Sequence, residues 1–291
     1  MAETVGIIGL GLIGGALAER LATTGNAPVV HDLRAEAVDA AVAAGAVRAG
    51  SARELGERCD LVLIAVRDDS QCVEVVSDVV DGAHPGTVIA VLSTVTPETV
   101  TRLAAQASAR GMHLVDAPLA GQGRASVLDA TMSVLVGGPE DVVARLLPTF
   151  ERFAASVVPT GPIGSGAALK LAHNVMVYLG YAAVVEAVEL AAAAGVRDGL
   201  VEQVTRHSGT LSAQSEIFLR IYERRRHGIG TEEEDEVMRV SATLLDKDLR
   251  HAVAVAREHG QSLPVSELLQ GTGENVYLAR RRPRPRPGGT E

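Results

Sequence analysis

The feature that most constrains the fold is a glycine-rich segment close to the start of the chain, between a short apolar run and a helical pattern. In a strand–turn–helix unit, Gly9 permits the tight turn and Gly11 lets the backbone approach a pyrophosphate, whereas Gly14 allows close packing of helix on strand. Leu12 and Ile13 fall at the N-terminus of the helix, where free N–H groups and the helix dipole favour an anion. The segment therefore predicts a dinucleotide-binding unit.

An aspartate further along the chain supports this interpretation. Asp32 lies 18 residues beyond Gly14, at the end of the second predicted strand. A carboxylate at that place accepts hydrogen bonds from the adenosine ribose and repels a 2′-phosphate, so it favours NAD over NADP. Arg34, two residues further on, carries the charge needed to hold a 2′-phosphate. NADP therefore stays open as the alternative cofactor.

The first half of the chain alternates short β-branched runs with alanine-rich segments. Such alternation predicts βαβ units and a doubly wound, Rossmann-type α/β domain whose parallel sheet is covered by helices on both faces. The predicted strands are residues 5–8, 27–31, 61–66, 88–91, 113–116, 133–136 and 156–159. The predicted crossover helices are residues 15–24, 34–44, 69–80, 97–109 and 139–153.

Strand signals stop after residue 163, and long helical patterns replace them. The predicted helices are residues 165–194, 198–207, 212–226, 237–259 and 264–279, with the acidic block at 232–236 as a solvated loop and helix start. We expect a dinucleotide-binding domain over residues 1–162 and an all-α domain for substrate binding and oligomerisation over residues 163–279. Residues 280–291, rich in arginine and proline, predict a disordered tail.

Composition argues against several other classes of protein. The net charge of −9 and the 2% aromatic content disfavour a nucleic-acid partner, which needs basic surface and stacking side chains. Cys59 and Cys72 lack the spacing of metal ligands, so we expect no metal site. With no signal peptide and no apolar run near the ~18 residues of a membrane span, we expect a cytoplasmic protein. The apolar helix at 165–194 predicts a homodimer or higher homo-oligomer.

A second motif places a lysine and an asparagine on one face of a predicted helix. Residues 164–174 read Gly-Ser-Gly-Ala-Ala-Leu-Lys-Leu-Ala-His-Asn. Lys170 and Asn174 are four residues apart and therefore lie one turn above the other. A lysine beside a dinucleotide site can exchange the proton that accompanies hydride transfer. His173 points about 100° away, so we interpret it as a packing or surface residue.

Four motifs together resemble the β-hydroxyacid dehydrogenase family, which includes 3-hydroxyisobutyrate dehydrogenases, tartronate semialdehyde reductases and 6-phosphogluconate dehydrogenases. Residues 6–14 are similar to its cofactor signature, 114–121 to its substrate-binding segment, 164–174 to its catalytic-lysine segment and 247–249 to the lysine motif of its helical domain. The resemblance implies hydride transfer between NAD(H) and a small β-hydroxy acid or the corresponding carbonyl compound. It makes Lys170 the general acid/base.

The same resemblance implies roles for other residues. Asn174 orients the substrate or the lysine, and Lys247 contacts the substrate or the nicotinamide, whereas Asp248 pairs structurally. Thr94 lies beside the nicotinamide, and Val66 lines the adenine-to-ribose side. The expected cofactor-binding residues are thus Gly9, Gly11, Leu12, Ile13, Gly14, Asp32, Val66, Thr94 and Lys247.

The substrate-binding segment departs from the family pattern. A serine followed by two glycines is usual there, but this chain has Ala120, Gly121 and Gln122. Losing the serine hydroxyl weakens binding of a substrate carboxylate by about 1.5–3 kcal/mol unless another group, such as Gln122, replaces it. The usual Gly-Thr-Leu further on reads Ala130-Thr131-Met132. We therefore expect the family's reaction on a substrate different from that of its commonest members.

Two other functions are compatible with the same fold. An imine reductase of similar architecture is disfavoured by Lys170, because enzymes resembling that group generally lack this lysine. A non-catalytic dinucleotide-sensing protein is disfavoured by the joint presence of Lys170, Asn174 and Lys247. Binding alone does not require an acid/base lysine.

Overall fold

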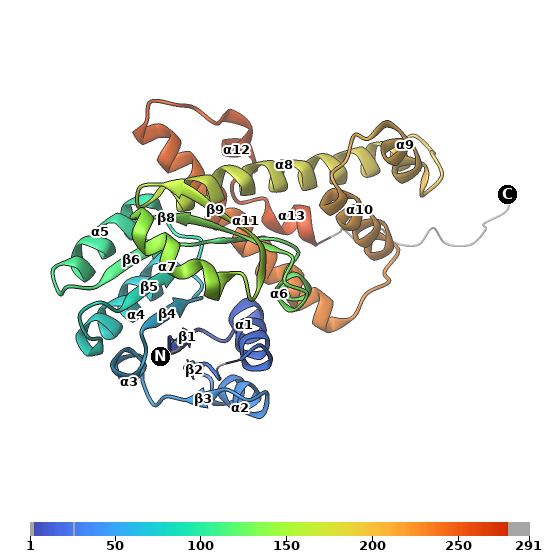
Figure 1. Cartoon of the computed structure of the whole chain (residues 1–291). Coiled ribbons are helices and arrows are strands. Elements are labelled where there is room, and N and C mark those ends of the chain that lie inside the picture. The colour runs from blue at the N-terminus through green and yellow to red at the C-terminus, as the bar shows by residue number, and fades with distance from the viewer. Residues whose placement is uncertain (1–2, 26, 279–291) are drawn as a thin grey trace, which may run out of the picture. The chain divides into compact units, whose positions relative to one another are not determined.

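The computed structural model describes residues 3–25 and 27–278. The chain divides into two compact units, the first ending at Leu171 and the second beginning at Ala172. This division falls inside one long helix, α8 (Ser165–Ala193), which can be followed in Figure 1. The tail expected at residues 280–291 lies outside the described residues.

Within its described residues, the first unit contains a nine-stranded sheet. The strand order is β3-β2-β1-β4-β5-β6-β8-β7, and β9 pairs with β8. The strands are β1 (Val5–Ile8), β2 (Val29–His31), β3 (Val47–Arg48), β4 (Leu61–Ile64), β5 (Val88–Val91), β6 (His113–Asp116), β7 (Leu119–Ala120), β8 (Met132–Gly137) and β9 (Ala154–Gly161). The chain order reverses between β1 and β4, which is the switch point where doubly wound sheets bind ligands.

The first six strands of the sheet are parallel, as expected, but the last part differs. β8 runs antiparallel to β6 and β7, and β9 runs parallel to β8. The connection from β6 to β8 contains only β7 and one short helix, whereas a parallel return needs a full crossover. β9 is mostly exposed or half-buried.

Helices cover both faces of this sheet, as the alternation predicted (Figure 1). One apolar cluster holds Leu17, Leu146 and Phe150 against one face, and a second holds Leu55, Val76 and Leu103 against the other. The helices are α1 (Leu12–Thr23), α2 (Ala35–Ala43), α3 (Ala52–Arg58), α4 (Asp69–Gly82), α5 (Pro97–Ser108), α6 (Arg124–Leu128) and α7 (Glu140–Phe150). Both cysteines are buried free thiols whose pKa burial raises to about 12.

The short elements of the first unit were not expected from the sequence. β3 and β7 have two residues each, too few to show an alternating pattern. α3 and α6 have seven and five residues, and α3 is mostly polar. A capping signal does precede α3, since the Ser51 side chain accepts a hydrogen bond from the Glu54 backbone N–H at 3.1 Å.

The second unit is helical throughout its described residues. Beyond its part of α8 it contains α9 (Leu200–Ser208), α10 (Ala213–Arg226), α11 (Glu232–Glu258), α12 (Pro264–Leu269) and α13 (Gly273–Tyr277). Its core is aromatic despite the scarcity of such residues: Tyr181 stacks on Phe218 with ring centroids 4.1 Å apart, and Tyr277 meets both edge-on. This core gives the helical unit an interior of its own.

Two helix boundaries in this unit differ from the expectations. α11 begins at Glu232 and absorbs the acidic block, because Thr231 and Glu234 form a reciprocal capping box and acidic residues favour a helix N-terminus. The helix expected at 264–279 is instead two short helices, α12 and α13, separated at Gly271, whose φ is +77°. A residue with that backbone angle ends a helix.

One described helix, α8, is long and apolar enough to cross a membrane. We expected no apolar run near the ~18 residues of a membrane span. Judged by length and composition alone, that expectation is wrong. Such a helix is weak evidence for a membrane span, because the core helix of a soluble protein has the same length and composition. Two large apolar side chains of α8 are strongly exposed, Met176 at 77% and Leu190 at 72%.

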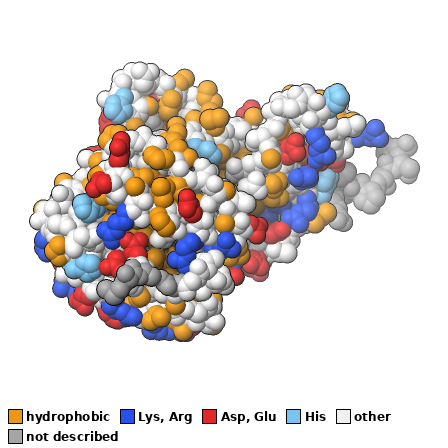
Figure 2. Space-filling model, in the orientation of Figure 1, with side chains coloured by type: hydrophobic (Ala, Val, Ile, Leu, Met, Phe, Trp, Pro, Cys, Tyr) orange, Lys and Arg blue, Asp and Glu red, His pale blue; other side chains and the backbone are white. Residues whose placement is uncertain are grey.

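Basic and acidic side chains intermingle on the face of the molecule shown in Figure 2. Many charged side chains of the described residues are paired: the side chains of Arg58 and Glu54 lie 2.8 Å apart, as do those of Arg145 and Glu3. Exposed pairs of this kind contribute little to stability. They do break up the positive charge that a phosphate backbone would require.

Candidate functional site

The glycine-rich segment forms a tight turn that only glycine can make. Gly9 directly follows β1 with φ +89°, and a Cβ atom there would lie 2.4 Å from the Ala65 carbonyl oxygen. A Cβ atom on Gly14 would lie 1.8 Å from the Gly9 carbonyl oxygen. Both distances are far below van der Waals contact, so the turn and the packing of α1 on β1 each depend on a missing side chain.

Gly11 has the opposite environment. It is the N-cap of α1, and a Cβ atom on it would meet nothing within 4 Å. No side chain caps this helix, so the N–H groups of Leu12 and Ile13 keep their donors free of a capping partner. The open space and the helix N-terminus fit a pyrophosphate. These residues therefore fit the dinucleotide that the sequence predicts.

Asp32 follows β2 and binds the glycine-rich loop directly. Its Oδ2 accepts a hydrogen bond from the Leu10 backbone N–H at 2.6 Å. Arg34 surrounds the same carboxylate, with its backbone N–H 2.8 Å and its Nε 3.1 Å from Oδ1. Burial raises the pKa of the Asp32 carboxyl, but the hydrogen bonds from Arg34 and Leu10 outweigh burial and bring the pKa below its usual value. Asp32 is thus held as a carboxylate.

The loops after β4 and β5 are tied together by a residue that the sequence analysis did not assign to the site. Ser93, which is 7% exposed, accepts a hydrogen bond at its Oγ from the Val66 N–H at 2.9 Å and donates one to the Val66 carbonyl at 2.8 Å. Thr94, the next residue, is half-buried. Since β1, β4 and β5 are neighbours in the sheet, Val66 and Thr94 follow strands that end along the same edge as Gly9.

The unusual substrate-binding segment is hydrogen-bonded to the short helix that follows it, α6. The Oγ of Ser126 accepts a hydrogen bond from the Gln122 backbone N–H at 2.8 Å, while Gln122 itself is exposed. Ala120, at the end of β7, is half-buried. A Cβ atom on Gly121 would lie 2.1 Å from the Met132 sulfur. The Met132 side chain therefore occupies the space that a side chain on Gly121 would need.

A backbone outlier marks the end of the same segment. Ala130 has φ +54°, and it is the one non-glycine residue with positive φ among those the structure describes. It occupies the position where the resemblance leads us to expect glycine. For an L-residue this conformation costs about 1–2 kcal/mol. The chain thus carries local strain where it departs from the family pattern.

Asp116 fixes the start of the helix that carries the candidate catalytic lysine. It ends β6, is 1% exposed, and accepts hydrogen bonds from the backbone N–H groups of Gly164 (2.8 Å) and Ala167 (2.7 Å). Burial raises the pKa of its carboxyl, and these donors offset part of that effect. The fit is close, because a Cβ atom on Gly137 would lie 2.5 Å from Asp116 Oδ1. The sequence analysis did not assign Asp116, although it lies within the motif at 114–121.

Lys170 lies in the second turn of α8 and is half-buried. Asn174 occupies the next turn of the same helix, so the sequence prediction of their spacing on one helix is confirmed. His173 is half-buried, and its Nδ1 lies 3.2 Å from the Asn174 side-chain oxygen. The amide of Asn174 therefore has a neighbour on its own helix. The interpretation of His173 as a packing or surface residue stays a prediction.

In the second unit, a buried carboxylate gathers the polar side chains around Asn174. Asp248 of α11 is 3% exposed, and its Oδ2 accepts hydrogen bonds from Asn174 Nδ2 at 2.7 Å and from the Tyr178 hydroxyl at 2.9 Å. Lys247 Nζ lies 2.9 Å from the other oxygen, Oδ1. Burial and the Asp248 charge both raise the pKa of Tyr178, so its hydroxyl stays protonated as a donor.

The cluster around Asp248 contains three residues of the sequence motifs and one residue, Tyr178, that the sequence analysis did not assign. Asn174, Lys247 and Asp248 belong to two motifs some 70 residues apart, and the fold of the second unit brings them together. Tyr178 was not assigned, yet it follows Asn174 by four residues and lies on the same face of α8. The spacing argument that selected Lys170 and Asn174 therefore contained the signal for Tyr178.

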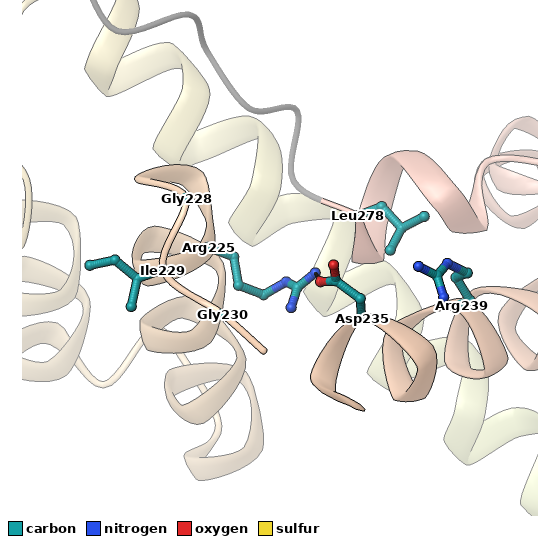
Figure 3. Close-up of a pocket in the computed structure, with 7 residues that line it drawn as sticks. All are labelled: Arg225, Gly228, Ile229, Gly230, Asp235, Arg239 and Leu278. Atoms are coloured by element: carbon teal, nitrogen blue, oxygen red, sulfur yellow. Dashed lines mark hydrogen bonds and ion pairs between the residues drawn. The ribbon is translucent and has the colours of Figure 1, made fainter. Parts of the chain in front are cut away.

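A cavity of about 230 Å³ in the second unit contains none of the expected site residues (Figure 3). Arg225 on α10 and Asp235 on α11 face each other across it as an ion pair. Its other lining residues are Gly228, Ile229, Gly230, Arg239 and Leu278. In the described part of the chain, residues 3–25 and 27–278, no group of His, Cys, Asp or Glu side chains is placed to hold a metal ion.

Two family models match the two parts of the chain. Residues 4–161 match a family model described as the NAD-binding domain of 6-phosphogluconate dehydrogenase. Residues 164–277 match a model described as the NAD-binding part of NADP-dependent 3-hydroxyisobutyrate dehydrogenase. Together the two models cover the glycine-rich turn, the lysine helix and the Asp248 cluster.

Individual relatives support the same assignment. The chain is 32% identical to an NAD-dependent L-serine dehydrogenase of Pseudomonas aeruginosa, over 74% of this chain and 73% of that protein. It is 33% identical to a 2-hydroxy-3-oxopropionate reductase of Escherichia coli, over 68% of each. A solved 3-hydroxyisobutyrate dehydrogenase of Salmonella typhimurium superposes with a TM-score of 0.81 at 27% identity, over 96% of both chains. The protein belongs to the β-hydroxyacid dehydrogenase family of NAD(P)-dependent oxidoreductases.

Proposed function

We propose that the protein transfers a hydride between NAD(H) and a small β-hydroxy acid or the corresponding carbonyl compound, with Lys170 as general acid/base. The observation that carries this proposal is the construction of α8. Its first turn is anchored on the buried Asp116 carboxylate, and Lys170 follows one turn later, half-buried. A helix fixed at its start holds the lysine amine in a defined position, which proton transfer requires.

The proton and the hydride leave the substrate together in the oxidative direction. As the C–H bond transfers its hydride, the hydroxyl oxygen on the same carbon loses a proton, which the neutral Lys170 amine accepts. In the reductive direction the Lys170 ammonium returns that proton to the carbonyl oxygen. The bound nicotinamide supplies or accepts the hydride. Lys170 therefore has to be neutral to accept the proton and charged to return it.

The cofactor residues follow from the geometry of the first unit. We assign the pyrophosphate to the open N-terminus of α1, where Gly11, Leu12 and Ile13 lie. Asp32 accepts the ribose hydroxyls, which makes NAD the preferred cofactor. Thr94 is proposed to lie beside the nicotinamide, and Val66 to line the adenine-to-ribose side. A clear preference for NADPH in the Michaelis constants would reverse the NAD assignment.

Asn174, Lys247 and the segment from Ala120 to Gln122 are proposed to bind the substrate. Asn174 and Lys247 share the buried Asp248 carboxylate, which holds both side chains in place. Ala120 offers no hydroxyl to hold a substrate carboxylate, and the nearby Ser126 Oγ accepts a hydrogen bond from the Gln122 backbone N–H. We infer that the substrate differs from 3-hydroxyisobutyrate in the group that this hydroxyl would hold.

The test is a screen of short hydroxy acids and their semialdehydes, including L-serine and 3-hydroxyisobutyrate, followed by NADH absorbance. Wild type and Lys170→Ala are compared, with Arg220→Ala, an exposed arginine of α10, as the control. We expect turnover of at least one hydroxy acid by wild type and by the control, and its loss in Lys170→Ala. Efficient turnover of 3-hydroxyisobutyrate would contradict the altered pocket.

The two alternative functions give different outcomes when cyclic imines and NADPH are added to the screen. An imine reductase would reduce cyclic imines with NADPH and leave hydroxy acids unchanged. A dinucleotide-sensing protein would bind NADH and turn over none of the compounds. The presence of Lys170 disfavours the first, because an acid/base lysine serves a hydroxyl or carbonyl oxygen.

We also propose that the protein is a cytoplasmic homodimer or higher oligomer. The exposed apolar side chains of α8, Met176 and Leu190, are of the kind that a second copy covers. Light scattering at micromolar concentration measures the mass directly. A monomer at that concentration would contradict the oligomer.

A further inference from the structure

The loop that follows β5 carries Thr94, and the residues on both sides of Thr94 are fixed. Ser93, on one side, is hydrogen-bonded to the backbone N–H and the carbonyl of Val66. Val95, on the other side, is fully buried in the apolar cluster that packs against one face of the sheet. Thr94 itself is half-buried. Its backbone is therefore held in place from both directions along the chain.

Asp69 holds the end of this loop from a different helix. It is the first residue of α4 and is half-buried. Its Oδ1 accepts hydrogen bonds from the Thr96 backbone N–H at 3.1 Å and from the Thr99 hydroxyl at 2.7 Å. The Thr96 hydroxyl lies 3.3 Å from the same oxygen. One carboxylate oxygen thus ties the start of α5 to the start of α4.

Neither helix depends on Asp69 for its N-terminal cap. Asp68 caps α4 by accepting a hydrogen bond from the Gln71 backbone N–H at 2.9 Å. Thr96 caps α5 by accepting one from the Thr99 backbone N–H at 3.2 Å. Since both helix starts have capping groups of their own, what Asp69 adds is a fixed separation between the loop after β4 and the loop after β5.

We propose that Asp69 is a positioning residue, which sets the place of the nicotinamide through Thr94. The proposal rests on the cofactor assignment of the proposed function, in which Thr94 lies beside the nicotinamide. Hydride transfer is sensitive to small displacements, and a shift of about 1 Å in the reacting atoms costs about a hundredfold in rate. Asp69 limits such a shift by holding the loop, and not by contact with the reacting atoms.

A positioning residue and a purely structural tie predict different binding data. The residues assigned to the adenine half of the cofactor, Gly9 to Gly14 and Asp32, follow β1 and β2, whereas Asp69 and Thr94 follow β4 and β5. Loosening the loop after β5 therefore weakens binding of NADH, which carries the nicotinamide. It leaves binding of ADP-ribose, which lacks the nicotinamide, unchanged. A general loss of stability weakens the binding of both compounds.

The experiment measures dissociation constants for NADH and ADP-ribose by calorimetry, which needs no substrate and no turnover. In Asp69→Ala we expect the constant for NADH to rise about fivefold and that for ADP-ribose to stay within about twofold of wild type, because the donors of α5 lose their acceptor. Asp69→Asn keeps a side-chain oxygen as acceptor and should retain most of the wild-type affinity for NADH. Thermal unfolding verifies that each variant is folded.

Asp81→Ala is the matched control, because Asp81 is a carboxylate near the other end of the same helix. It pairs with Arg53 at 3.3 Å and with Arg110 at 3.4 Å. Both dissociation constants of this variant should stay within about twofold of wild type. Thr99→Val removes the 2.7 Å donor and leaves the Asp69 side chain in place, so it should repeat the effect of Asp69→Ala in smaller measure. It replaces Asp69→Ala if that variant fails to fold.

Thr94→Ala tests whether Asp69 acts through Thr94. If it does, adding Asp69→Ala to Thr94→Ala changes the dissociation constant for NADH by less than about twofold, because the two residues act as one unit. Independent residues would instead give effects that multiply, and that result overturns the role of Asp69 through Thr94.

Equal weakening of NADH and ADP-ribose in Asp69→Ala, or unchanged NADH binding, also overturns the positioning role. Failure of wild type to bind either compound overturns the cofactor assignment itself, and this proposal with it. Loss of turnover in Lys170→Ala concerns proton transfer and leaves the Asp69 comparison decisive, since binding is measured without turnover.

Discussion

The glycine-rich turn and the Asp248 cluster are built on opposite physical principles. At the turn, the missing side chains of Gly9 and Gly14 let backbone meet backbone: a Cβ atom on Gly9 would collide with the Ala65 carbonyl, and one on Gly14 with the Gly9 carbonyl. In the cluster, Asp248 holds Asn174 and Tyr178 across 74 and 70 residues of sequence, in an interior where an unpaired charge is costly. The first region depends on steric fit and the second on hydrogen bonds, so they fail differently when changed.

The largest expected effect comes from adding one methyl group to the turn. In Gly14→Ala the new Cβ would lie 1.8 Å from the Gly9 carbonyl oxygen, and neither is a flexible atom. We expect a loss of about 3 kcal/mol in the free energy of unfolding, measured by denaturant titration.

Gly11→Ala is the matched control, because its Cβ meets nothing within 4 Å. It should unfold like wild type but bind NADH more weakly, since the methyl group occupies the approach of the pyrophosphate. Equal stability losses in the two variants would contradict the steric account of the turn.

Tyr178→Phe tests the Asp248 cluster by removing a single hydroxyl group. It removes one donor from the buried Asp248 carboxylate and should cost about 2 kcal/mol in unfolding free energy. If the cluster positions Asn174 for the reaction, kcat should also fall about tenfold with little change in the KM for NADH.

Tyr222→Phe serves as its control, because the Tyr222 hydroxyl donates at 3.2 Å to Glu189, whose side chain is 35% exposed. It should cost under about 1 kcal/mol. An intact kcat in Tyr178→Phe would make the cluster purely structural.

Ala130→Gly tests whether the backbone at Ala130, where the chain departs from the family pattern, is strained. Glycine adopts φ +54° freely, although it loses more chain entropy on folding. The balance predicts a gain of about 0.5–1 kcal/mol in unfolding free energy. No gain would mean that the surrounding segment relaxes the strain at Ala130.

The smallest effect concerns the pH dependence of Asp32. Its pKa is lowered in the folded state, so its contribution to stability is present above the ordinary aspartate pKa and is lost as pH falls through the folded pKa. The difference in unfolding free energy between wild type and Asp32→Asn should therefore shrink as pH falls below about 4, by under about 1 kcal/mol. A difference independent of pH would contradict the charged state assigned to Asp32.

What the sequence predicted follows the same division. Gly9, Gly11, Gly14 and Asp32 could be predicted because they stand at fixed spacings around the first two predicted strands, although Gly9 and Asp32 have partners elsewhere in the chain. The order of alternating elements was likewise sufficient for the longer parallel strands of the first unit, but not for the two-residue strands β3 and β7. The direction of β8 was also missed, because it depends on the length of one connection.

The missed residues share long-range partners. Asp116 contacts the start of α8 some 50 residues later, Ser93 reaches back to Val66, and Tyr178 meets Asp248 from another helix. No pattern of spacing reveals such pairs, because the fold rather than the local sequence brings them together. Tyr178 was the exception, since its position on the face of Lys170 and Asn174 could be counted.

The central claim is that Lys170 exchanges the proton that accompanies hydride transfer, and Lys170→Met tests it most directly. Methionine keeps the length of the side chain and removes the amine. We expect kcat for the best hydroxy acid to fall at least about a hundredfold, while the dissociation constant for NADH stays within about twofold of wild type. Retention of more than a tenth of wild-type kcat with normal NADH binding would contradict the claim.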